Sequence, residues 1–261
     1  MKNFNFKSAT NTKEASKLVS GRATFLAGGM TILPAMKLGL AAYSDLINIK
    51  KIKSLSGIKI SSKSLKIGAT TKHAEVSSSK EIGKSIPSLA ILAEGIGDPQ
   101  VRNRGTIGGS IANNDPAADY PSACLALNAT IHTSKRKIPA DKFFKGMFET
   151  DLKKGELIES IEFEVPEKSA YAKFPNPASR YAVVGVYIAK LKTGVRVAVT
   201  GVENCVFRCR KLEDALSDNF STSAIDNVNI SSKGFNADIH ASAEYRAHII
   251  KVMAKKAVSS C

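Results

Sequence analysis

Residues 101–119 read Val101-Arg102-Asn103-Arg104-Gly105-Thr106-Ile107-Gly108-Gly109-Ser110-Ile111-Ala112-Asn113-Asn114-Asp115-Pro116-Ala117-Ala118-Asp119. The pair Gly108-Gly109 stands between small hydroxyl residues, and a run of polar side chains follows it. Glycine lets a backbone come close to a ligand, and the start of a helix offers free N–H groups to an anion. The stretch therefore predicts a phosphate-binding loop. It matches neither the G-x-G-x-x-G pattern of dinucleotide-binding folds nor the G-x-x-x-x-G-K-S/T pattern of nucleotide triphosphatases.

A second glycine pair stands near the N-terminus. Residues 25–27 are strand-like, Gly28-Gly29 follows them, and a helix is predicted to start near Thr31. A strand that delivers two glycines into the start of a helix has the same features as the first loop. Two such loops suit a diphosphate better than one does. We therefore predict that residues 27–31 and 106–110 together bind a diphosphate.

The first 165 residues alternate between strand and helix patterns, which favours α/β units. An N-terminal cap at Asn11, with Glu14 three residues on, predicts a helix that stops at Gly21. Asp115-Pro116 predicts another helix start, and Asp119, four residues on, would share a helix face with Asp115. The other elements follow from periodicity. Helices are predicted at 11–20, 31–38 and in two pieces over 70–94, and strands at 25–27, 46–49, 65–68 and 156–165.

The pattern changes after a proline-containing stretch at 166–177, where we place a boundary. Two apolar strands, 181–191 and 195–202, are predicted to form a hairpin. The chain then ends in a predicted long helix over 238–258. Its residues at core-like spacing are Tyr245, Ile249, Val252 and Met253. The sequence thus predicts an α/β front part and a smaller α+β back part.

Composition argues against several classes of function. The chain has 261 residues, 43% of them hydrophobic, and a net charge of +15, but its basic clusters are short and scattered, which disfavours nucleic acid as a partner. No apolar run reaches the roughly 18 residues of a membrane helix, and no apolar leader opens the chain, so we expect a cytoplasmic protein. Neither the cysteines nor the histidines show metal-ligand spacing, and no nucleophile–base set stands out. These residues are Cys124, Cys205, Cys209, Cys261, His73, His132, His240 and His248. We predict no metal site and no catalytic residue in this chain.

Residues 101–119 closely resemble the signature of the FAD-binding medium subunit of molybdenum hydroxylases. That family includes the medium subunit of carbon monoxide dehydrogenase and the flavin domain of xanthine dehydrogenase. Three further stretches agree in the expected order, at 27–37, 181–186 and 238–246. Flavin cofactors carry their own redox chemistry, which agrees with the lack of an acid–base set in the chain.

The resemblance implies an α+β fold with three parts. Residues 1–168 would form the two-subdomain FAD-binding fold of the vanillyl-alcohol-oxidase (PCMH) type, with subdomains at about 1–55 and 56–168. Residues 169–261 would form a C-terminal α+β domain of the carbon monoxide dehydrogenase flavoprotein type. FAD would lie between the two subdomains, with its diphosphate on both glycine loops.

The resemblance also implies a set of FAD-binding residues. Asp119 would bond to cofactor hydroxyl groups, Ile96 and Ile158 would lie against the cofactor, and Lys173 would stand near the flavin ring. A cation there favours reduced flavin, which tends to be anionic. The full set is Phe25, Leu26, Ala27, Gly28, Gly29, Met30, Thr31, Ile32, Ile96, Thr106, Ile107, Gly108, Gly109, Ser110, Asp119, Ile158 and Lys173. Met30, Ser110 and the stretch 175–177 with Arg180 depart from what is usual in the family, and the last departure concerns the acceptor side of the flavin or a subunit contact.

In function, the resemblance implies an electron-transfer subunit. It would take electrons from a small subunit with a 2Fe–2S cluster, itself fed by a molybdopterin-binding large subunit, and pass them to NAD or a quinone. Two alternatives stay open: a stand-alone flavin oxidoreductase of the same fold, and a scaffold subunit that has lost FAD.

Overall fold

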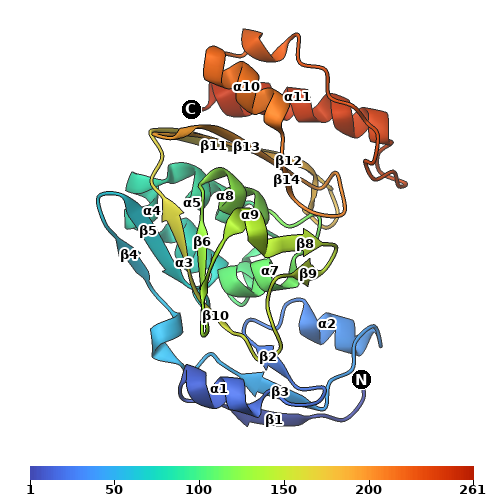
Figure 1. Cartoon of the computed structure of the whole chain (residues 1–261). Coiled ribbons are helices and arrows are strands. Elements are labelled where there is room, and N and C mark those ends of the chain that lie inside the picture. The colour runs from blue at the N-terminus through green and yellow to red at the C-terminus, as the bar shows by residue number, and fades with distance from the viewer.

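The computed structural model describes all residues from 1 to 261, and Figure 1 shows three successive units along the chain. The first unit, in blue, is a small parallel sheet with strand order β1-β3-β2. Its seven-residue core includes Leu157 from the second unit. The elements are β1 (Asn5–Ser8), α1 (Thr12–Leu18), β2 (Thr24–Leu26), α2 (Ile32–Lys37), β3 (Asp45–Asn48) and the 3-10 turn η1 (Lys53–Leu55).

Helix α1 begins as predicted but ends early. The side chain of Asn11 accepts a hydrogen bond from the backbone of Glu14 at 2.9 Å. The carboxylate of Glu14 returns to the backbone N–H of Thr10 at 2.8 Å rather than to that of Asn11. The helix ends at Leu18, three residues before the predicted stop at Gly21.

The second unit contains an antiparallel sheet with strand order β4-β5-β10-β6-β7, whose core of 30 buried residues is the largest in the chain. Its strands are β4 (Ile58–Ile60), β5 (Ser64–Gly68), β6 (Thr130–Thr133), β7 (Lys137–Pro139) and β10 (Ile158–Glu164), with a hairpin of β8 (Phe144–Gly146) and β9 (Glu149–Thr150) beside them. Its helices are α3 (His73–Ser78), α4 (Lys80–Ser85), α5 (Pro87–Glu94), α6 (Pro99–Arg102), α7 (Ile107–Asn113), α8 (Tyr120–Ala126) and α9 (Ala140–Phe143). Strand β10 has a register shift against β6 between Ile158 and Ser160. The alternation of apolar and polar residues over 156–165 also slips by one position there.

The third unit is a four-stranded antiparallel sheet, β11-β12-β13-β14, whose outer face is covered by α10 and α11 (Figure 1). The predicted hairpin is present, with Leu191 paired to Gly194. Strand β12 is buried on both faces: Tyr187 joins the core of the second unit, and Val186 joins the core beneath α11. The elements are β11 (Lys168–Pro175), β12 (Ala182–Leu191), β13 (Gly194–Thr200), β14 (Phe207–Arg208), α10 (Arg210–Asp218), η2 (Ser223–Ile225) and α11 (Ala243–Ser259). Because cores are shared across the units, the limits 1–168 and 169–261 stay predictions.

Two helix predictions over the second unit are wrong in detail. Residues 70–94 form three helices rather than two, because Ser79 ends α3 and caps α4 by accepting from Ile82 N at 3.2 Å. The helix expected at Asp115 begins at Tyr120 instead. The carboxylate of Asp115 accepts from Ala117 N at 2.9 Å and closes a local turn. Asp115 and Asp119 therefore do not share a helix face.

The C-terminal helix also differs from its prediction. It starts at Ala243, five residues after the predicted position, because Ser242 caps it by accepting from Tyr245 N at 3.2 Å. Ile249 and Met253 are buried as expected. Tyr245 and Val252 were expected in the core but are 43% and 40% exposed. No helix of the chain has both the length and the apolar character to cross a membrane.

Candidate functional site

The two glycine loops contact each other. A β-carbon added to Gly28 would lie 2.2 Å from the carbonyl oxygen of Arg104 and 2.8 Å from the Cα of Gly105. Gly28 is therefore the point where the first loop rests on the residues that lead into the second. The structure brings together two segments that are about 75 residues apart in sequence, as two loops sharing one ligand require.

The first loop presents a row of free backbone donors. Gly29 adopts a φ of +79°, which turns the chain between β2 and α2. The backbone N–H groups of residues 28–32 have no acceptor within the chain, and Thr31 at the start of α2 makes no side-chain cap. Successive free amides at a turn form an anion-binding concavity. These amides are hydrogen-bond donors, and there are enough of them to bind the oxygens of a phosphate group.

The second loop differs from its prediction, because its amides are already bonded. Ile107 N donates to Thr71 O at 3.1 Å, and Gly108 N donates to Ala69 O at 2.9 Å. The capping hydroxyl of Thr106 accepts from Gly109 N at 3.2 Å. The expected free N–H groups at this helix start are therefore absent, and the loop is fastened to the segment that follows β5.

Glycine serves two different purposes in the second loop. A β-carbon on Gly108 would lie 2.5 Å from Cβ of Ala69, so this glycine allows close packing. Gly109 is exposed, and a β-carbon there would meet only the Thr106 hydroxyl, at 2.9 Å. The open face of α7 continues from Gly109 to Ala112 and Asn113, which are not buried. Sequence reasoning missed these two residues, although their spacing of three and four from Gly109 marks the same helix face.

A second group of predicted residues gathers around Lys173. The Lys173 Nζ lies 3.0 Å from Asp119 Oδ1 and donates to the carbonyl oxygens of Gly95 at 2.8 Å and Arg180 at 3.0 Å. The hydroxyl of Tyr171 donates to the same carboxylate. Burial raises the pKa of Asp119, and the charge of Lys173 opposes that rise. The ammonium is thus fully bonded within the chain rather than free beside a ligand.

Ile96 lies next to this group, in a turn whose carbonyl oxygens accept hydrogen bonds from two arginine side chains. The Arg102 guanidinium donates to the carbonyl oxygens of Ile96 at 3.1 Å and Gly97 at 3.0 Å. Arg180 donates to the same Gly97 oxygen at 3.1 Å. Ile96, Asp119 and Lys173 therefore form one cluster. Ile158 does not join them: it is buried in the core of the second unit and is not accessible to a ligand at the surface.

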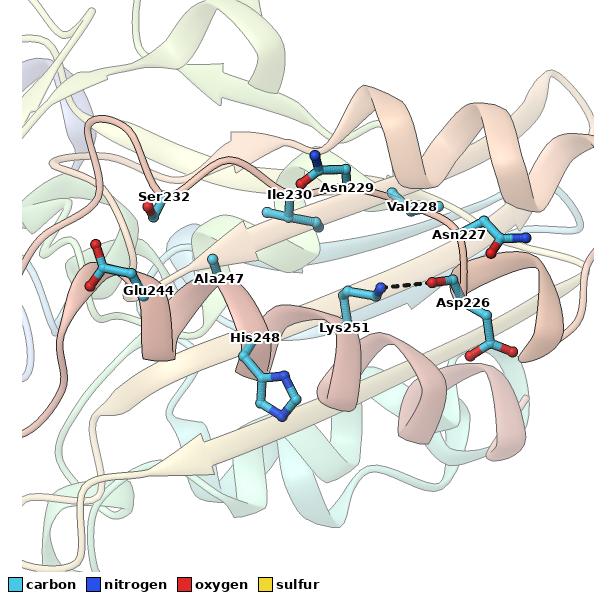
Figure 2. A pocket seen from close by; sticks show the side chains of 10 residues that line it. All are labelled: Asp226, Asn227, Val228, Asn229, Ile230, Ser232, Glu244, Ala247, His248 and Lys251. Carbon is cyan, nitrogen blue, oxygen red and sulfur yellow. Dashed lines mark hydrogen bonds between the residues drawn. The ribbon is translucent and has the colours of Figure 1, made fainter.

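One hollow of the surface lies away from the glycine loops. A groove of about 490 Å³ runs between α11 and the segment 226–232 in the third unit (Figure 2). Lys251 crosses it and donates to the carbonyl oxygen of Asp226 at 2.8 Å, and His248 of α11 is among its lining residues. None of the predicted site residues lines this groove. No cluster of three histidine, cysteine, aspartate or glutamate side chains is placed to hold a metal ion.

The chain is similar to known proteins over almost its whole length. The family model described as "FAD binding domain in molybdopterin dehydrogenase" matches residues 2–167. The glyceraldehyde dehydrogenase medium chain of Sulfolobus acidocaldarius is 34% identical, over 97% of this chain and 96% of the relative. The alpha subunit of the 6-hydroxypseudooxynicotine dehydrogenase complex of Paenarthrobacter nicotinovorans is 30% identical, over 98% and 93%.

Solved structures show the same arrangement. A chain of carbon monoxide dehydrogenase from Hydrogenophaga pseudoflava superposes with a TM-score of 0.90 at 32% identity, covering 99% of this chain and 96% of that chain. A chain of the reconstituted carbon monoxide dehydrogenase from Oligotropha carboxidovorans gives a TM-score of 0.91 at 27% identity, covering 99% and 97%.

Proposed function

The chain belongs to the family of FAD-binding domains in molybdopterin dehydrogenases, and from this premise we propose that it is the electron-transfer subunit of a molybdenum hydroxylase complex. The observation that carries the proposal is the row of free amides at residues 28–32, which begins where Gly28 rests on the residues that lead into the second glycine loop. Such a concavity suits the diphosphate that joins the two halves of FAD.

Family membership confirms three expectations from the sequence. The fold is the α+β, PCMH-type FAD-binding fold, the cofactor is FAD, and the chain is an oxidoreductase subunit. Its relatives include medium chains of multi-subunit dehydrogenases. The route and the acceptor of the electrons belong to the proposal.

We assign the binding roles as follows. The amides of residues 28–32 hold the diphosphate, Thr31 and Ser110 add hydroxyl groups, and Gly109 leaves room for the ligand to approach. Ile96 packs against the flavin end, next to the Lys173–Asp119 pair. FAD supplies redox chemistry when it is bound, and the chain supplies binding, orientation and electrostatics.

The partners are proposed from the resemblance to the family, whose members include medium chains of multi-subunit dehydrogenases. We propose a molybdopterin-binding large subunit and a small subunit with a 2Fe–2S cluster as neighbours, and NAD or a quinone as acceptor. We also keep the proposed division into residues 1–168, which bind FAD, and residues 169–261. Strand β11 joins the two, because it begins at Lys168 and carries Lys173 back to Asp119.

Purification of the native complex tests the proposal. We expect the chain to carry FAD at about one per chain, and to co-purify with a molybdopterin subunit and an iron–sulfur subunit. A yellow chain without those partners would favour a stand-alone flavin oxidoreductase. A colourless chain that assembles with both partners would favour a scaffold subunit and would contradict the proposal.

A further inference from the structure

Three cations surround the contact between the glycine loops, and each comes from a different backbone segment. Lys50 follows β3, whose partner β2 leads into the first loop, and Ile49 N donates to Leu26 O at 3.1 Å. Lys72 pairs with Thr106 through an antiparallel β-bridge at the start of the second loop. Arg104 is the residue whose carbonyl oxygen rests on Gly28. We call Lys50, Lys72 and Arg104 the cationic trio.

The trio has no acidic partner. None of the ion pairs of the chain involves Lys50, Lys72 or Arg104. The carboxylate of Glu75 accepts from the backbone N–H of Lys72 at 2.7 Å, not from its ammonium. Partial burial lowers the pKa of Lys50, and the charges of Arg104 and Lys72 lower it further. The three cations therefore repel one another, a cost that an anion held among them would remove.

The backbone segments of the trio and the free amides meet at one contact. The amides of residues 28–32 supply donors without net charge, and the trio adds three positive charges around the same contact. A diphosphate diester carries two negative charges, so the combined site matches it in sign and approximately in magnitude. Hydrogen bonds and ion pairs to phosphate are the stronger type, because one partner is ionised.

We propose that Lys50, Lys72 and Arg104 are FAD-binding residues that neutralise the diphosphate held by the first glycine loop. The proposal rests on the proposed function, since it assumes FAD at the two loops. It adds residues that the resemblance did not assign. An acidic surface of a partner subunit is the competing occupant, and the free amides favour the diphosphate because they lie at the same contact.

Titration of the FAD-free full chain with FAD tests this directly. We expect Lys50→Met and Arg104→Met each to weaken FAD binding about tenfold, as loss of a hydrogen bond to a charged group does, and the triple variant with Lys72→Met to weaken it further. Lys50→Arg should retain most of the affinity. Lys63→Met is the matched control, because Lys63 lies at the opposite end of β5 from Gly68 and the loops.

Three more measurements separate a charge effect from misfolding. Wild-type affinity should fall as salt is raised, because salt screens charge pairs, and the triple variant should show a flatter dependence. Inorganic pyrophosphate should compete with FAD on the wild type and much less on the triple variant. Unchanged thermal unfolding would show that the variants fold.

The outcomes distinguish this inference from the proposed function. FAD binding by wild type with an unchanged Kd in the triple variant would overturn the role of the trio and leave the proposed function standing. Normal FAD affinity with weakened assembly would assign the trio to an acidic partner instead, which also overturns the proposal. No FAD binding by any form, wild type included, would contradict the proposed function itself.

Discussion

The Lys173 ammonium lies 3.0 Å from Oδ1 of Asp119, and the two side chains are only 10% and 5% exposed. Asp119 precedes α8 in the second unit, whereas Lys173 lies on β11 of the third. The pair therefore joins two units whose sheets are separate. Removing one partner of a buried pair leaves an uncompensated charge, which costs more than the intact pair contributes.

Replacing Lys173 alone should therefore destabilise the fold. We expect Lys173→Met to lower the free energy of unfolding by about 3 kcal/mol. The double variant Lys173→Met with Asp119→Asn should lose less, because no buried charge is left. Urea unfolding monitored by circular dichroism measures both. Lys168→Met, at the exposed start of β11, is the control. Equal losses in the single and double variants would show that the charge is not the reason.

The same pair predicts opposite shifts of the flavin reduction potential. Asp119→Asn leaves the Lys173 cation uncompensated next to the proposed flavin position, so the potential should rise. Lys173→Met leaves the carboxylate, so the potential should fall. Redox titration of the FAD-loaded variants gives both values. If neither variant shifts the potential, the flavin does not lie beside this cluster.

Gly109 and Gly108 offer a matched contrast within one loop. Gly109→Leu should abolish FAD retention while the chain still folds, because the new side chain enters the exposed space above the second loop, which the ligand is proposed to occupy. Gly108→Ala should reduce stability instead, because its β-carbon would lie 2.5 Å from Cβ of Ala69. Absorbance of bound flavin and thermal unfolding separate the two effects. Full FAD content in Gly109→Leu would contradict the loop assignment.

Patterns among neighbouring residues predicted many of the elements. Where such a prediction is wrong, the reason lies in the same short stretch of sequence. The glycine pairs, the hairpin at 192–194 and the slip in β10 could be seen in the sequence because each depends on neighbouring residues. The helix at 115 was predicted too early because Asp115 can cap a helix or close a turn, and its bond to Ala117 chose the turn. Nothing within that stretch decides between the two.

Long-range contacts explain what the sequence could not show about the site. The second loop looks open in sequence, but its amides are used by Ala69 and Thr71, which lie more than 30 residues away. Lys173 looked like a free cation, but its partner Asp119 is 54 residues away. Which donors stay free for a ligand depends on the assembled fold.

His73 lies beneath Gly105, the residue that leads into the second loop. It is 5% exposed, and its imidazole would be 2.5 Å from a β-carbon on Gly105. Its ring packs on Tyr120 with centroids 5.3 Å apart, and neither Nδ1 of His73 nor the hydroxyl of Tyr120 has a hydrogen-bond partner. Burial, and then the charge of Arg102, lower the pKa of His73 from 6.5 to about 4.

The lowered pKa makes stability depend on pH in a defined window. Above pH 6.5 His73 is neutral in the folded and unfolded chains, and it does not change their balance. Below that value His73 takes up a proton in the unfolded chain but stays neutral in the folded chain. Stability is therefore lost as the pH falls toward about 4. The loss should reach about 3 kcal/mol, because one pKa unit corresponds to about 1.4 kcal/mol. His73→Gln cannot titrate, so its unfolding free energy should fall less than that of wild type between pH 6.5 and 4. Parallel curves for the two proteins would show that His73 does not titrate across this range.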